Sequence, residues 1–91
     1  FLSLKSYPEA VSVLERAANA FPENGYVFYM LSLADDGNGD PLSAVLAARR
    51  SAELFKAQNN QEGFEQSALF MQALIKNEED KALKKTQQTK K

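Results

Sequence analysis

The amino-acid sequence predicts an all-α fold, an α-solenoid of antiparallel helix hairpins with about four helices. Capping and small residues recur at one interval, because Ser6 and Asp40 are 34 residues apart and so are Ala10 and Ala44. A fixed period of this length is typical of repeat proteins, in which each helix pair buries its apolar face against its neighbours. No segment alternates apolar and polar residues for long enough to predict a strand.

The first helix is predicted over residues 7–20. Ser6 and Glu9 have the spacing of a capping box, in which each side chain accepts a hydrogen bond from the other residue's backbone amide. Pro8 lies in the first turn, where a missing N–H group costs no hydrogen bond, and Pro22 marks the end. The predicted apolar stripe consists of Ala10, Leu14, Ala17 and Phe21.

Turn signals separate the second and third predicted helices. The second covers residues 25–35 and is capped by Asn24, and the cluster at residues 36–39 contains two glycines that adopt positive φ readily. Asp40 then caps a third helix, with Pro41 at the first helical position, which proline favours. The side of this helix expected to be buried consists of Ala44, Ala48, Ser51, Ala52 and Phe55.

A fourth helix is predicted over residues 61–83, after a capping-box pair formed by Asn59 and Glu62. Its predicted core stripe consists of Phe64, Ala68, Met71 and Ile75. Residues 68–75 are apolar nearly all round the helix, which predicts burial on more than one side. Residues 86–91 contain no apolar side chain and are expected to be disordered.

The chain is long enough for one small domain, with 91 residues of which 44% are hydrophobic. A helical repeat module is expected over residues 1–80, with units at about 1–24, 25–60 and 61–80. The module holds six Lys/Arg and 12 Asp/Glu, whereas residues 81–91 hold five lysines and no acidic residue. We therefore expect a mildly acidic module followed by a basic, disordered tail.

Two stretches of the sequence resemble a known family. The first has the spacing of the second half of a tetratricopeptide repeat, carried by Ala10, Leu14, Ala17 and Pro22. The second resembles the opening, the turn and the second helix of the next repeat, carried by Phe28, Leu31, Ser32, Gly39, Asp40 and Ala44. The sequence is therefore similar to a degenerate tetratricopeptide repeat (TPR) protein over residues 1–75.

The sequence also departs from the family pattern. Asp35 stands where the family usually has an aromatic residue, and Lys56 stands where the second unit would have its proline. The third unit keeps register only with about three extra residues. Residues 1–4 read as the end of a preceding helix, and the sequence starts at Phe1, so we expect the chain to be the C-terminal part of a longer repeat protein.

The resemblance implies where a partner would bind. In this family the first helix of each unit lines a concave groove that holds a segment of another protein. The implied groove wall consists of Tyr26, Tyr29, Leu33 and Asp36, extended by Leu69 and Gln72 from the final helix. Amphipathic tyrosines suit an interface, so we expect a non-catalytic scaffold or adaptor that binds a peptide or helix of another protein. The competing interpretation is that these side chains pack against a preceding helix or a neighbouring domain.

Some family members clamp a C-terminal carboxylate with lysine, arginine and asparagine side chains in this groove. Tyr29, Met30 and Leu33 occupy the comparable positions, so no such clamp is expected.

Two alternative functions are also open. The lysines of residues 81–91 could hold the phosphates of a nucleic acid, although this segment has no aromatic residue to stack on bases. Residues 68–75 could form a homo-oligomer through their apolar side chains. Their longest apolar run falls far short of the roughly 20 residues that span a bilayer, so no membrane span is expected.

Catalysis and metal binding are not predicted. The sequence has no histidine and no cysteine, and its acidic clusters at residues 35–36 and 78–80 read as solvated helix ends. Residues 36–40 begin like a calcium loop, but Pro41 and Ala47 stand where that loop needs glycine and glutamate. We therefore expect no cofactor, no metal and no small-molecule substrate.

Overall fold

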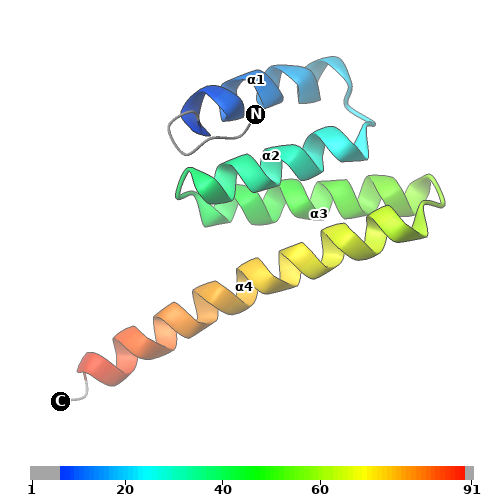
Figure 1. The fold of residues 1–91 in the computed structure, drawn as a ribbon. Coiled ribbons are helices and arrows are strands. Elements are labelled where there is room, and N and C mark those ends of the chain that lie inside the picture. Colours follow the sequence, from blue (N-terminus) through cyan, green and yellow to red (C-terminus); the bar gives the residue numbers. More distant parts are fainter. Residues whose placement is uncertain (1–6, 90–91) are drawn as a thin grey trace.

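The computed structural model describes residues 7–89, and the side chains of residues 7–84. Consecutive helices run antiparallel, and each packs on the next (Figure 1). The helices are α1 (Tyr7–Ala20), α2 (Gly25–Gly37), α3 (Pro41–Ala57) and α4 (Gln61–Thr89). Residues 7–89 contain no strand, so the predicted all-α arrangement of helix hairpins is confirmed. None of these four helices combines the length and the hydropathy needed to cross a bilayer.

Side-chain caps start three of the helices. The Asn24 side chain accepts from the amides of Tyr26 and Val27, and Asp40 Oδ1 accepts from the Ser43 amide at 3.2 Å. Both caps were predicted. The cap of α4 differs from the prediction, because Asn60 rather than Asn59 accepts from an α4 amide, that of Gly63, at 2.9 Å. Asn59 instead adopts φ 59° and ends the preceding helix, a role for which asparagine is suited. The predicted cap Ser6 lies outside the described residues.

The first hairpin buries one side of α1 against α2. Ala10, Leu14 and Ala18 are buried, and Ala10 and Leu14 belong to a cluster that includes Leu31 and Ala34. The predicted stripe was wrong in its second half: Ala17 is only half-buried and Phe21 is exposed. Steps of four residues from Ala10 lead to position 18, and Phe21 lies beyond the end of the helix.

The centre of the molecule is the buried side of α3. All five residues predicted for this side are buried, namely Ala44, Ala48, Ser51, Ala52 and Phe55. The Phe55 ring lies between two glycines: a Cβ atom built on Gly25 would lie 2.9–3.1 Å from its atoms, and one built on Gly63 would lie 2.6–2.9 Å away. Only glycine therefore fits at both positions without a shift of the ring.

The register of α4 differs from the prediction by one residue. Its buried positions are Gly63, Ser67 and Leu74, whereas the predicted stripe consists of half-buried residues and the exposed Ile75. One residue corresponds to a rotation of about 100° round the helix. The rotation places small residues, which permit a close approach, against α3. Within residues 68–75 only Leu74 is buried, and Leu69, Ala73 and Ile75 are exposed, so the expected burial on more than one side was also wrong.

A buried hydrogen-bond network connects the last three helices. The Ser51 hydroxyl donates to the Gly25 carbonyl at 2.8 Å, and the hydroxyl oxygens of Ser51 and Ser67 are 2.8 Å apart. Because the only Ser51 hydroxyl proton is directed at Gly25, Ser67 donates to Ser51. Both serines are fully buried. The network fixes the distance and rotation of α4 relative to α2 and α3.

Two helices are longer than predicted. Helix α2 ends at Gly37 rather than at residue 35, and α4 continues to Thr89 rather than to residue 83. The expected disorder of the tail was therefore wrong for residues 81–89. Lysine and glutamine favour a helix, no glycine or proline interrupts the segment, and the Lys81 ammonium pairs with the Glu78 carboxylate at 3.2 Å.

Candidate protein-interaction surface

The predicted partner-binding residues of α2 form one outward strip, which we call the α2 strip: Tyr26, Tyr29, Leu33 and Asp36. They follow one another at steps of three, four and three residues and therefore lie on one side of the helix. Tyr26 is 60% exposed, Asp36 is exposed, and the other two are half-buried. The strip is about 15 Å long at 1.5 Å per residue, and the buried residues Leu31 and Ala34 lie on other sides of the helix.

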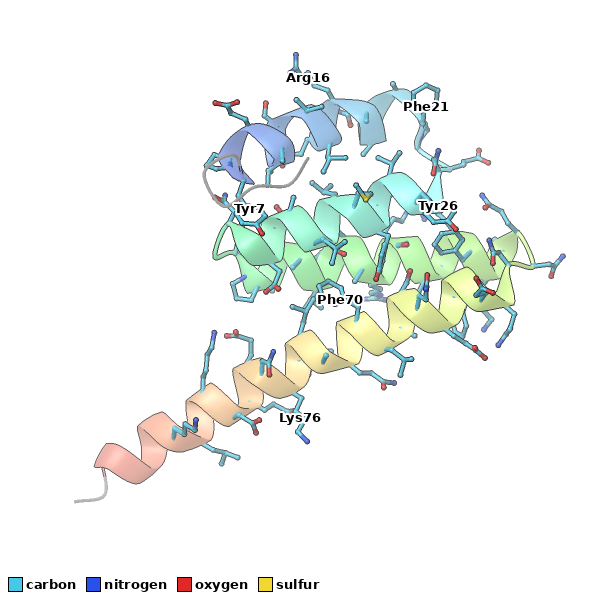
Figure 2. The ribbon with its side chains drawn as sticks, viewed as in Figure 1. Tyr7, Arg16, Phe21, Tyr26, Phe70 and Lys76 are labelled. Atoms are coloured by element: carbon cyan, nitrogen blue, oxygen red, sulfur yellow. The ribbon has the colours of Figure 1, made fainter. Side chains whose placement is uncertain are left out.

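At one end of the strip, the Tyr26 ring packs on a buried aromatic ring of α3. Its ring meets the Phe55 ring edge to face, with 5.2 Å between centroids and 84° between planes. Beside it lies an open pocket of about 570 Å³, whose walls include Phe21, Pro22 and Gln58. Figure 2 shows Phe21 and Tyr26 at the same end of the molecule, on either side of the turn between α1 and α2. Two exposed aromatic rings therefore border this pocket.

Tyr29 connects the strip to the final helix. Its ring meets the ring of Phe70 on α4, with 6.0 Å between centroids and 70° between planes. Figure 2 shows Phe70 on the side of α4 that faces the other helices. Phe70 was not among the predicted partner-binding residues, because the wrong register of α4 placed it outside the core. The spacing of three and four residues from Ser67 and Leu74 could have identified it.

The two predicted site residues of α4 lie apart from the strip. Leu69 is 66% exposed and is displaced by about 100° from Phe70 round the helix. Gln72 is exposed and lies two residues from both Phe70 and Leu74, about 160° round the helix from each. It therefore lies on the side of α4 opposite the contact with α2, while Leu69 flanks that contact.

Asp36 borders a second, polar pocket at the other end of the strip. This pocket of about 260 Å³ lies between α2 and α4, and its walls include Asn77, Asp80, Lys81 and Lys84. Both signs of charge are present, so the pocket offers both donors and acceptors to a partner. The α2 strip thus has an aromatic pocket at one end and a mixed-charge pocket at the other.

Asp35 is a buried carboxylate on the far side of α2 from Tyr26. Burial raises the pKa of Asp35 from its ordinary value of 3.8 to about 6, and the negative charges of Asp40 and Glu15 add to the increase. The group borders a small pocket that also contains Arg50. The other polar side chains that border this pocket are Glu15 and Ser43.

The aspartates of the turn serve as caps and helix ends. Asp40 accepts from the Ser43 amide, and at the end of α2 the backbone carbonyl of Asp36 accepts from the Gly39 amide at 3.1 Å. Among residues 7–84 no group of three or more acidic side chains is arranged to hold a metal ion.

No protein-family model, curated protein or solved structure significantly matches this chain. The function is therefore inferred from the α2 strip and its surroundings.

Proposed function

We propose that this chain is a non-catalytic protein–protein interaction module that binds a peptide or helix of a partner along the α2 strip. The observation that carries the proposal is the aromatic support of the strip. Tyr26 and Tyr29 each rest edge to face on a second ring, from α3 and α4 respectively, while Tyr26 remains 60% exposed. Aromatic side chains that are already packed against other rings lose little conformational entropy on binding, which favours affinity.

The two ends of the strip suggest how a bound segment would be oriented. An apolar or aromatic residue of the partner would enter the pocket beside Tyr26 and Phe21, and polar groups would meet Asp36 and Lys84 at the other end. Between them, Leu33 offers a half-buried apolar contact. A segment of about five extended residues, or about three helical turns, covers this length of 15 Å.

The resemblance to TPR proteins supports the same surface. In that family α2 and α4 would be the first helices of two consecutive units, and these helices line the partner groove. The Tyr29–Phe70 contact joins these two helices at the strip.

The test begins with a peptide library displayed on phage and selected against the whole chain. Selected peptides are then titrated into isotopically labelled protein, and amide chemical shifts are followed by NMR. We expect the largest changes at residues 26–36, and at least about tenfold weaker binding for Tyr26→Ala. Leu46→Ala is the matched control, because Leu46 is 58% exposed on α3 and should leave binding unchanged. Equal binding by both variants, with shifts confined to another surface, would disprove the proposal.

Neither alternative function gains support from the arrangement of α4. Lys81 and Lys84 lie on a helix beside Glu78, Glu79 and Asp80, which weaken attraction to phosphate. In residues 68–75, Leu74 is buried and Phe70 packs on Tyr29, so much of this apolar segment is occupied within the chain.

A further inference from the structure

The second half of α4 leaves the helical stack. Contact with α3 is tight where Gly63 meets Phe55 and Ser67 meets Ser51, and Leu74 is the last buried residue among those whose side chains are described. Beyond it α4 diverges from α3, and a wedge opens between the two helices (Figure 1). This wedge lies on the α3 side of α4, and the one residue that it shares with the pocket between α4 and Asp36 is Glu78.

The wedge is an apolar groove of about 440 Å³, which we call the α3–α4 groove. Its apolar walls consist of Pro41, Leu42 and Val45 from α3, and of Ile75 and Ala82 from α4. Leu42 is 72% exposed and Ile75 is 40% exposed, which is costly for large apolar side chains in water. Leu42 and Val45 are three residues apart on α3, and Ile75 and Ala82 are seven apart on α4, so each pair lies on one face of its helix.

The charges at the groove have one sign. Glu78 and Glu79 border it, and no basic side chain belongs to its walls within the described residues. Glu78 pairs with Lys81, but no ion pair is found for Glu79 in the described part of the chain. An occupant with lysine or arginine beside its apolar residues would therefore complement this border.

We propose that the α3–α4 groove binds a basic amphipathic helix of a partner protein. From Ile75 to Ala82 the α4 wall is about 10 Å long, the distance covered by apolar residues at positions i, i+4 and i+7 of a docked helix. Two diverging helices present a groove that a third helix fills by ridge-into-groove packing. Lysines flanking the apolar stripe then lie opposite Glu78 and Glu79.

A second copy of this chain is a poor occupant. The projecting part of α4 offers only Ala82 and Leu83 as apolar side chains between residues 76 and 84. The six charged residues of that segment lie all round the helix, so pairing two α4 helices would place some of these charges against the apolar walls.

The probe is a synthetic helix of about 15 residues with leucine at i, i+4 and i+7 and lysine on both flanks. Its affinity for the whole chain is measured by fluorescence anisotropy. A scrambled peptide of the same composition tests the need for one apolar face, and a peptide with glutamate in place of lysine tests the charge. We expect the lysine probe to bind at least about tenfold more tightly than either control.

Two exposed positions provide the protein variants. Leu42→Glu should weaken binding of the lysine probe at least about tenfold, and Glu79→Lys should weaken it while strengthening binding of the glutamate probe. Leu69→Glu is the matched control, because Leu69 is 66% exposed on α4 but outside the groove. Equal effects of Leu42→Glu and Leu69→Glu would overturn the proposal. So would a dimer in sedimentation equilibrium that Leu42→Glu dissociates, because a second copy would then be the occupant.

Discussion

Replacement of Asp35 by asparagine should stabilise the protein near neutral pH. The carboxylate is buried between α1, α2 and α3, and its neighbours Asp40 and Glu15 are also acidic, with Arg50 the one basic group in the same pocket. Asp35 also lies near the C-terminal end of α2, where the helix dipole disfavours a negative charge. Asparagine keeps the shape of the side chain and removes the charge.

The pKa of Asp35 determines how the free energy of unfolding changes with pH. The pKa of this carboxyl group is about 6 in the folded state and near 3.8 in the unfolded state. Between these pH values the folded chain binds more protons than the unfolded chain, so the free energy of unfolding decreases as pH rises through about 6. A difference of about two units between the two pKa values corresponds to at most about 3 kcal/mol in the free energy of unfolding, and we expect Asp35→Asn to stabilise the protein by about 1–3 kcal/mol at pH 8.

Urea unfolding followed by circular dichroism, at pH values from 4 to 8, measures this effect. The native chain should lose stability over that range, and Asp35→Asn should flatten the curve and be the more stable protein at pH 8. Asp36→Asn is the neighbouring control, because that side chain is exposed and should leave the slope unchanged. Two results would refute the assignment of the buried charge. One is that the free energy of unfolding of Asp35→Asn falls with pH as steeply as that of the native chain, and the other is that Asp35→Asn is less stable than the native chain at pH 8.

Three further substitutions test the packing, with the free energy of unfolding as the measurement. Gly63→Ala should cost about 1–3 kcal/mol, because the new methyl group meets the Phe55 ring, and Phe55→Leu should relieve part of that cost in a double-mutant cycle. Ser51→Ala should cost about 1–3 kcal/mol by removing one donor to the Gly25 carbonyl and leaving the buried Ser67 hydroxyl without its acceptor. Leu14→Ala should cost about 2–5 kcal/mol by opening a cavity between α1 and α2. A neutral result for any of them would contradict the contact concerned.

Local signals in the sequence were sufficient to predict where most helices begin. Asn24 and the Asp40-Pro41 pair are cap signals that depend on two to four neighbouring residues, and α2 and α3 start where these signals place them. The outward position of Tyr26 also follows from helical periodicity within one segment. Features of this kind are predictable because the interacting groups are close in sequence.

The contacts of α4 were not predictable in the same way. Its rotation is fixed by Gly63 and Ser67, which are small or polar and give no hydrophobic signal. Their partners on α3, Phe55 and Ser51, lie beyond the turn that separates the two helices. A stripe of large apolar side chains was the natural prediction, and it placed Phe70 outside the core and Gln72 beside the α2 strip. The unexpected positions of Phe70 and Gln72 thus follow from one error in register.

The same rotation determines both proposed surfaces. If Ile75 faced the core, as the predicted stripe required, the α3–α4 groove would lose an apolar wall. Phe70 would also turn by about 100° away from Tyr29, and the α2 strip would lose the ring that supports it. Because Gly63 and Ser67 accept the close approach of Phe55 and Ser51, Leu69 and Ile75 remain exposed on α4. Small residues at the contact between α3 and α4 therefore leave exposed apolar side chains for both proposed surfaces.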